Sequence, residues 1–224
     1  VDVGGGGGGR ESENGLIGTE EAGRRVGRNR DNQMQATFAR DAGASAPVRI
    51  EYDGDSVEWG FVHGGAQAGE ARLAAIEAAA QAVLPEKLYA GVRYESICPG
   101  IEARYTLEGL SCKEDIVVES REAMEYTSIW IRSNDLRFVM AQDGGVEARL
   151  DDQPVFRFAP PTASDSAGLT DVPVPIRLTE TEGGTRLDYL PDEAFMQAAV
   201  FPIVIDPSVE VVNETCNLDD NYLC

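Results

Sequence analysis

The stretch YESICPGIEARYTLEGLSCKEDIVVE, residues 94–119, decides the fold. Apolar and polar residues alternate over 101–107 and again over 112–118, on either side of a short turn at 108–111 that contains Gly109. Such alternation around a turn predicts a β-hairpin, and Pro99-Gly100 predicts a second corner just before it. Alternate side chains of a strand point to opposite faces, so one face of this hairpin is expected to be buried. The inward set is Ile101, Ala103, Tyr105 and Leu107.

The same pattern recurs along most of the chain. Residues 48–52 and 57–61 alternate around Asp53-Gly54, a dipeptide that favours a tight hairpin turn. Many short strands separated by turn signals are typical of antiparallel sheet proteins. The expected fold class is therefore mainly β, an antiparallel β-sandwich or rolled sheet. The further expected strands are 88–97, 126–131, 136–141, 146–150, 155–158, 172–178, 185–190 and 200–205.

In one segment the apolar residues recur at helical spacing instead of at every second position. Residues 68–84 are rich in Ala, and Leu73, Ile76, Ala80 and Val83 recur at helical spacing before Pro85. This pattern predicts one inserted α-helix at about 68–84. Residues 190–195 predict a helical turn, and Pro173 and Pro175 indicate an edge strand, where a missing N–H donor does least harm.

The composition suggests three regions. Residues 1–32 begin with a run of six glycines and have little hydrophobic periodicity, which predicts a flexible Gly-rich leader. Residues 33–209 are expected to form one β-rich domain. Residues 210–224 form a third, short region after it.

The net charge of the chain limits the kinds of partner that it is expected to bind. The 224 residues carry a net charge of -20, which repels phosphate backbones, so nucleic acid is not expected as a partner. The acid excess is interpreted as a solvated surface, because no segment has the spaced ligands of an EF-hand loop. No run of apolar residues reaches membrane-helix length, so no membrane insertion is expected. Nothing at Val1 resembles a signal peptide, and an export signal is expected upstream of it.

The four cysteines leave their pairing open. Cys216 and Cys224 are a candidate disulfide at the end of the chain. A bridge between Cys98 and Cys112 is disfavoured, because the hairpin register places Cys112 near Leu107. Free, partly buried thiols are the alternative. No metal site is expected, since the chain has a single histidine, His63, and no closely paired cysteines.

Catalytic chemistry would have to use carboxylates, because the sequence has no hydrolase or zinc-peptidase motif. Glu114 and Asp115 could in principle form a glycosidase pair. Neighbours on a strand point to opposite faces, however, so the two cannot line one site without a bulge. The preferred interpretation is cross-strand ion pairing of Lys113 and an adjacent acid with Arg104 or Glu102. We therefore expect no enzyme activity, no catalytic residues and no cofactor.

A carbohydrate- or ligand-binding module is the stronger alternative. β-Sandwiches can present aromatic side chains on one exposed face. For Trp59 and Trp130, however, core packing is the simpler interpretation, because both fall on the apolar phase of their strands. The aromatic residues available for such a platform are Trp59, Trp130, Tyr89, Tyr94 and Tyr126.

Two distant motifs resemble a known group of proteins. The first comprises Tyr94, Pro99-Gly100-Ile101, Arg104-Tyr105, Gly109 and KEDIV at 113–117, and the second is FPIVIDPSV at 201–209. Together they resemble the N-terminal β-rich region of secreted bacterial RHS/YD-repeat, wall-associated, teneurin-like and DNRLRE-domain surface proteins. The signature residues, expected to be structural, are Pro99, Gly100, Tyr105, Lys113, Glu114, Asp115, Asp206 and Pro207.

The resemblance implies a location and a role. It implies a secreted or cell-surface protein associated with the bacterial cell wall, in which this region is a non-catalytic structural domain of an adhesin or a polymorphic-toxin shell. The implied partners are the downstream domains of the same polypeptide, together with cell-wall or host surface glycans or proteins. The resemblance also implies that residues 210–224 are the start of a following β-repeat domain or a tail. It supplies no ligand-binding residues.

Overall fold

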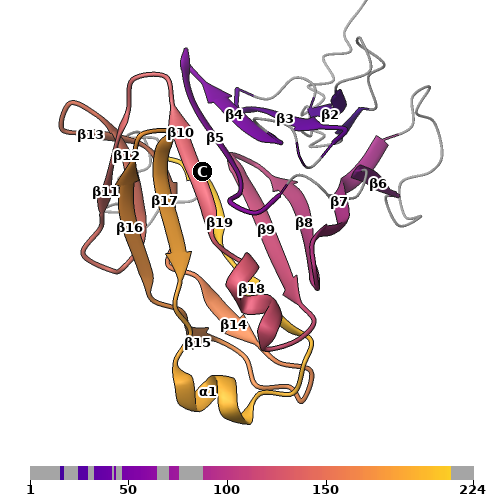
Figure 1. Ribbon diagram of the computed structural model, residues 1–224. Helices are drawn as coiled ribbons and strands as arrows, with labels where there is room; N and C mark the ends of the chain where they lie inside the picture. The colour runs from indigo at the N-terminus through magenta and orange to yellow at the C-terminus, as the bar shows by residue number, and fades with distance from the viewer. Residues whose placement is uncertain are drawn as a thin grey trace, which may run out of the picture.

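Antiparallel strands make up most of the protein, which is drawn as a computed structural model in Figure 1. The structure describes residues 33–41, 43, 47–64 and 91–212, and the backbone alone at 16–17, 25–29, 71–75 and 88–90. Every strand pairing in these residues is antiparallel. The mainly β class predicted from the sequence is confirmed.

The strands form two layers of one rolled sheet (Figure 1). The first layer follows the hydrogen-bonded order β16, β17, β10, β5, β4, β3 and β2. The strands of this layer are β2 (Arg25–Asn29), β3 (Gln35–Ala39), β4 (Val48–Tyr52), β5 (Asp55–Phe61), β10 (Ile129–Ser133), β16 (Ile176–Thr181) and β17 (Gly184–Tyr189).

The second layer follows the order β6, β7, β8, β9, β19, β13, β12 and β11. Its strands are β6 (Ala71–Ala75), β7 (Leu88–Cys98), β8 (Ile101–Glu108), β9 (Ser111–Val118), β11 (Arg137–Met140), β12 (Val146–Leu150), β13 (Gln153–Phe158) and β19 (Ser208–Val211). From β9 a branch continues through β18 (Ile203–Asp206), β14 (Thr162–Ser164) and β15 (Val172–Pro173). β1 (Leu16–Ile17) pairs with β2 and β7 and so joins the layers.

The core lies between the two layers and is centred on Tyr105. Its ring lies 5.5 Å from Phe38, 6.3 Å from Trp59 and 5.9 Å from Tyr94, measured between ring centroids. Trp59 also meets Phe158 edge-on at 6.0 Å. These rings come from β3, β5, β7, β8 and β13, so burial of their apolar area holds both layers together.

Both predicted hairpins are confirmed. In β4–β5 the turn residues Asp53 and Gly54 have φ of 50° and 92°, the left-handed values that a two-residue turn of this kind requires. In β8–β9, Leu107 faces Cys112, as the sequence predicts. The predicted inward side chains of β8 are all buried.

The predicted helix at about 68–84 is wrong where the structure describes it. Residues Ala71–Ala75 form strand β6, which pairs with β7 from Ala71 opposite Tyr94 to Ala75 opposite Tyr89. Helix propensity is a weak preference. The edge of the long strand β7 offers backbone hydrogen bonds, and these outweigh the small apolar burial that a helix with a narrow apolar stripe would gain. The other residues of 68–84 lie outside the described part of the chain.

The predicted region boundaries also need correction. Strands β1 and β2 lie within 1–32, where a leader without regular structure is expected, and β2 pairs with β3. At the other end, β19 extends to a buried Val211, two residues beyond the expected boundary at 209. Residues 213–224 lie outside the described part of the chain.

Shorter elements follow local signals. The helical turn predicted near 190–195 is α1 (Glu193–Ala198), which is capped by Asp192 through the N–H groups of Ala194 and Phe195. The strand expected at 126–131 begins at Ile129, because Glu122–Tyr126 form the 3₁₀ helix η2. Pro173 lies on β15, an edge strand among the described residues, as predicted.

Gly91 allows strands β7 and β8 to lie close together. A Cβ on Gly91 would lie 2.2 Å from the Tyr105 backbone oxygen. Gly91→Ala is therefore expected to destabilise the protein by about 2–3 kcal/mol in urea unfolding, because the strands must separate. Gly183→Ala is the control, since its Cβ would meet nothing nearer than the Arg132 Nη2 at 3.7 Å. Equal effects of the two substitutions would contradict this account.

Candidate functional site

The structure brings the two signature motifs together. β9 pairs with β18 and with β19, so residues 112–118 lie beside 203–210. The Lys113 ammonium lies 3.1 Å from Asp206 Oδ2 and 3.8 Å from Asp115 Oδ1. The backbone N–H of Glu114 donates to the Pro207 carbonyl at 3.0 Å. The motifs are therefore two halves of one strand junction.

Pro99 and Gly100 form the corner between β7 and β8, as predicted. The Gly100 carbonyl accepts a hydrogen bond from the Glu119 N–H at 2.9 Å, which ties this corner to the end of β9.

Glu114 is a buried carboxyl in the core. Only 1% of the residue is exposed, and Tyr105 donates its hydroxyl to Glu114 Oε1 at 2.5 Å. Burial raises the pKa of Glu114 to about 7, although the hydrogen bond from Tyr105 lowers it. Burial likewise raises the pKa of Tyr105, and the nearby Glu114 charge raises it further.

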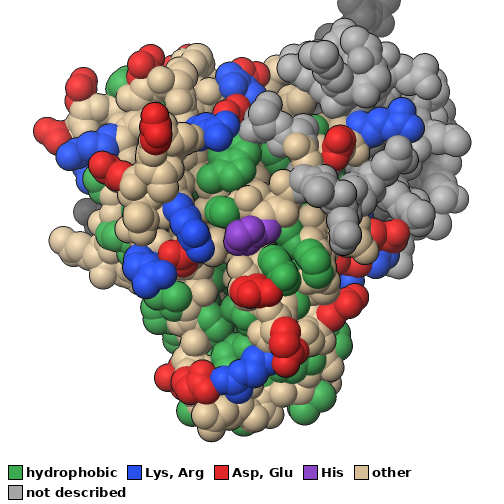
Figure 2. Space-filling view, viewed as in Figure 1, with side chains coloured by type: hydrophobic (Ala, Val, Ile, Leu, Met, Phe, Trp, Pro, Cys, Tyr) green, Lys and Arg blue, Asp and Glu red, His purple; other side chains and the backbone are tan. Residues whose placement is uncertain are grey.

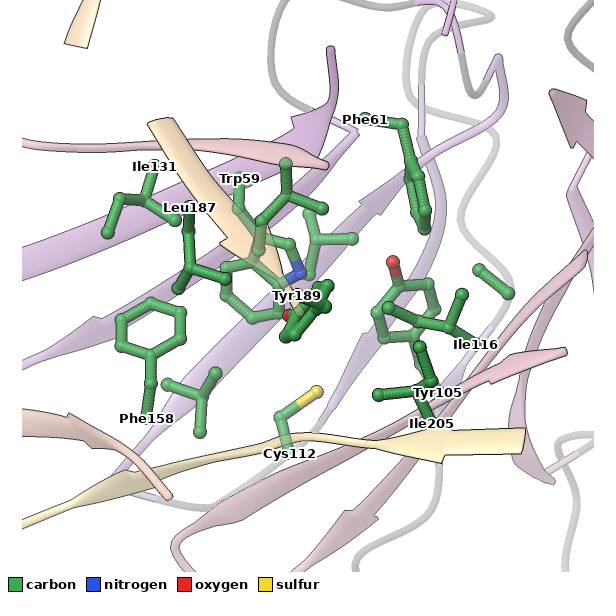
Figure 3. Close-up of a cluster of buried hydrophobic side chains, with 14 of the residues drawn as sticks. Trp59, Phe61, Tyr105, Cys112, Ile116, Ile131, Phe158, Leu187, Tyr189 and Ile205 are labelled. Carbon is green, nitrogen blue, oxygen red and sulfur yellow. The ribbon is translucent and has the colours of Figure 1, made fainter. Parts of the chain in front are cut away.

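Two other polar groups in this core have no hydrogen-bond partner. They are the indole Nε1 of Trp59 and the hydroxyl of Tyr189, both buried. Figure 3 draws both residues in one cluster of buried side chains that also includes Tyr105 and Cys112. Buried polar groups usually find partners, so this is the least satisfied part of the described core.

Glu114 and Asp115 point to opposite faces of β9, as strand geometry predicts. Asp115 is a third exposed, and burial raises its pKa while Lys113 lowers it. A glycosidase pair cannot form from two carboxyls on opposite sides of a sheet.

The predicted cross-strand ion pairing with Arg104 or Glu102 is wrong in its partners, although Arg104 lies opposite Asp115 and its charge lowers the pKa of that carboxyl. Lys113 pairs with Asp115 and Asp206 and not with Glu102. Glu102 instead binds Arg93 and Arg104, each at 2.5 Å. Burial raises the pKa of Glu102, but these two hydrogen bonds outweigh it and leave the pKa below its ordinary value. Arg93 reaches Glu102 from β7, which pairs with β8 on the edge away from β9.

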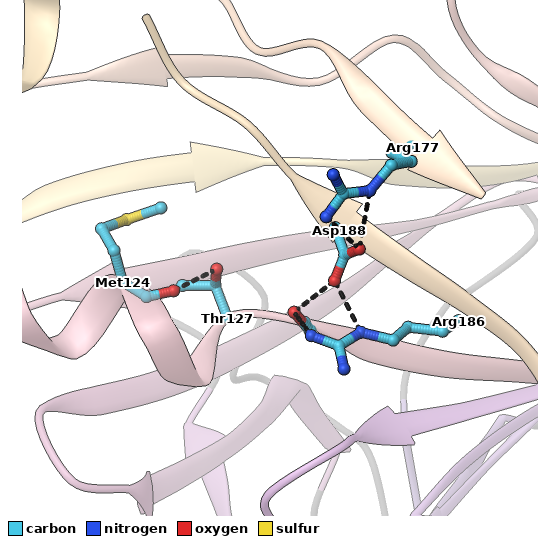
Figure 4. A network of polar contacts seen from close by, with 6 residues as sticks. Met124, Thr127, Arg177, Arg186 and Asp188 are labelled. Carbon is cyan, nitrogen blue, oxygen red and sulfur yellow. Dashed lines mark hydrogen bonds and ion pairs between the residues drawn. The ribbon is translucent and has the colours of Figure 1, made fainter. Parts of the chain in front are cut away.

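A second polar cluster lies on the outer face of the first layer (Figure 4). Asp188 accepts from Ser128 Oγ at 2.7 Å, from Arg186 Nε at 2.7 Å, and from Arg177 Nε and Nη2 at 3.2 and 3.0 Å. Burial raises the pKa of Asp188, but these donors outweigh it and the pKa lies below its ordinary value. Sequence reasoning missed this cluster, although Arg186 and Asp188 share one phase of β17.

Trp130 is not a core residue, which corrects the sequence interpretation. It is half-buried on the outer face, opposite Arg186 in the strand register, and the Arg132 guanidinium carbon lies 4.1 Å above its ring centroid. The alternation of β10 buries Ile129 and Ile131 instead. Trp59 is fully buried, as predicted.

The other aromatic candidates do not join Trp130 in a platform. Tyr94 is buried and donates its hydroxyl to the Ala39 carbonyl at 2.6 Å. Tyr126 meets the exposed His63 ring edge-on at 5.7 Å. The side chain of Tyr89 lies outside the described part of the structure.

The described cysteines are free thiols. Cys98 and Cys112 are both buried and unpaired, and burial raises the pKa of Cys98 to about 11. Cys216 and Cys224 lie outside the described residues. In the described part of the chain, no group of three or more His, Cys, Asp or Glu side chains could hold a metal ion.

Comparisons with known proteins add no relative. No family model, no curated protein and no solved structure matches this chain. Within the described residues, no helix is both long and apolar enough to cross a membrane.

Proposed function

We propose that the chain is a non-catalytic structural domain that presents the downstream part of a large exported bacterial surface protein, of the adhesin or polymorphic-toxin-shell type. One observation carries the proposal. The two motifs of the resemblance are separated by 83 residues, 118–200, yet β9 joins them through two strand pairings and the Lys113–Asp206 ion pair.

The chemistry of the junction supports a structural role. Its buried acid, Glu114, is sealed in the core among aromatic rings, where a substrate has no access. Its exposed members, Lys113 and Asp206, form an ion pair of the kind that contributes about 0–1 kcal/mol and fixes register more than stability. Secretion, cell-wall association and the partners named above belong to this proposal.

Limited proteolysis with mass spectrometry tests the structural role. A protected fragment is expected to span β9 and β19 without an internal cut, because the junction makes 112–210 part of one cooperative unit. A nick between 119 and 202 that separates the two motifs would contradict the proposal. Turnover of a polysaccharide or peptide that is lost in Glu114→Gln would also contradict it.

A ligand-binding module is the second candidate, because Trp130 faces outward. Tryptophan fluorescence tests it, since Trp59 is buried and Trp130 is the half-exposed member of the two tryptophans. Saturable quenching by a polysaccharide, abolished in Trp130→Phe, would support a binding module. No quenching would leave the structural role alone.

A further inference from the structure

Two buried donors of the first layer lie in the core without a hydrogen-bond partner. They are the indole Nε1 of Trp59 on β5 and the hydroxyl of Tyr189 on β17. Trp59 is fully buried and Tyr189 is 4% exposed, so both groups are shielded from bulk water. A buried donor without a partner costs free energy, and a nearby acceptor that pairs with it would stabilise the fold.

Glu114 reaches the same interior from the second layer. Its Oε1 accepts the Tyr105 hydroxyl at 2.5 Å, and the ring of Tyr105 lies 6.3 Å from that of Trp59. Burial raises the pKa of Glu114 and the Tyr105 hydrogen bond lowers it. The Trp59 indole makes no hydrogen bond in this structure but is near enough to lower it as well. Burial raises the pKa of Tyr189, and the Glu114 charge raises it further, so these two groups also lie within electrostatic reach.

The titratable groups around Glu114 supply no positive charge. Burial raises the pKa of Tyr105, which stays a neutral phenol, and the pKa of the Cys112 thiol two residues away on β9. Asp115, the next residue along β9, is a second acid, and its charge adds to the effect of burial on the Glu114 pKa. The chain's only histidine, His63, is exposed on the surface (Figure 2). An ionised Glu114 therefore depends on hydrogen-bond donors for its stabilisation.

We propose that Glu114 is a pH-dependent hydrogen-bond switch between the two layers. In its protonated form the carboxyl is held within the second layer by Tyr105, its cross-strand neighbour. In its ionised form it also accepts the Trp59 indole N–H and the Tyr189 hydroxyl, and so joins β9 to β5 and β17. An ionised carboxylate offers acceptor sites on both oxygens and forms stronger hydrogen bonds than a neutral carboxyl. This switch is independent of the function proposed above.

The indole N–H signals in ¹H–¹⁵N NMR spectra of the whole chain test the switch. The chain has two tryptophans, and Trp130→Phe assigns the two signals. As the pH rises, the Trp59 signal is expected to move downfield with a midpoint of about 7, because the Glu114 carboxylate becomes its acceptor. The Trp130 signal is the internal reference, since that ring lies on the outer face against Arg132.

Three substitutions separate the switch from a general effect of pH. Glu114→Gln is expected to abolish the shift of the Trp59 signal. Tyr189→Phe removes one donor to the carboxylate and is expected to raise the midpoint by at least about one pH unit, the effect of one hydrogen bond to a charged group. Tyr52→Phe is the matched control, because Tyr52 is half-buried at the end of β4, and it should leave the midpoint unchanged.

Three results would overturn the inference. They are a Trp59 signal that does not move with pH, a shift that persists in Glu114→Gln, and a midpoint that is the same in Tyr189→Phe as in the wild type. Thermal melts verify that each variant is folded. The titration of the wild-type chain needs no variant, so the first of these results is decisive even where a substitution prevents folding.

Discussion

Replacement of Glu114 by glutamine is expected to stabilise the protein by about 3 kcal/mol above neutral pH and to leave its stability unchanged near pH 4. Glutamine is a neutral side chain of the same shape, and its Oε1 can still accept the Tyr105 hydroxyl that Glu114 accepts at 2.5 Å. The free energy of unfolding rises because glutamine carries no charge, so no carboxyl has to ionise in the core.

The sign follows from the raised pKa of Glu114. Its ordinary value of 4.5 applies to the unfolded chain, and burial raises it to about 7 in the folded protein. Between these values the folded state holds a proton that the unfolded state has lost, so stability falls as pH rises. The stabilisation is complete below about 4.5 and is lost once the pH passes about 7.

Urea unfolding at intervals from pH 4 to pH 8 measures this dependence. The free energy of unfolding of the wild-type protein should decline across the range, and that of Glu114→Gln should decline much less. Glu108→Gln, an exposed acid at the end of β8, serves as the control and should keep the wild-type slope. Parallel curves for wild type and Glu114→Gln would contradict this account, because they would mean that folding does not shift the pKa of Glu114.

Trp59→Ala is expected to cost about 3–5 kcal/mol of folding stability, the largest effect of any single truncation considered for this chain. The Trp59 side chain is fully buried and packs against Tyr105 and Phe158, both on the second layer. Truncation removes apolar contacts across the interior and leaves a cavity between the layers.

Trp130→Ala is the natural comparison, because it truncates the same residue type on the outer face. Loss of the Arg132–Trp130 contact and of a half-buried ring should cost about 1 kcal/mol. Chemical denaturation of both variants measures the difference. Equal costs would mean that Trp59 does not link the layers as its contacts indicate.

Local chemistry accounts for what the sequence predicts correctly. The Asp53-Gly54 turn, the register that places Leu107 opposite Cys112, and the buried phase of β8 all depend on residues a few positions apart. The sequence could also have predicted that Glu114 is buried. Glu114 shares its phase with Cys112 and Ile116, and the same register places it opposite Tyr105.

Other features depend on neighbours that are distant in the chain. The alternation of β10 places Trp130 on either of two faces, and the burial of Ile129 and Ile131 between the layers decides which. The segment Ala71–Ala75 forms a strand because β7 offers it an edge. The cluster around Asp188 requires β10, β16 and β17 to lie side by side.

The sequence alone determined a mainly β chain, its principal hairpins and their inward faces, because period and turn chemistry act within about ten residues. Only the tertiary structure decided that β9 joins β18 and β19, that Glu114 is enclosed by rings from several strands, and that arginines gather around Trp130. These features arise from pairing between segments far apart in the chain. Such pairing depends on which edges and faces remain after the local elements have formed, and no local pattern encodes it.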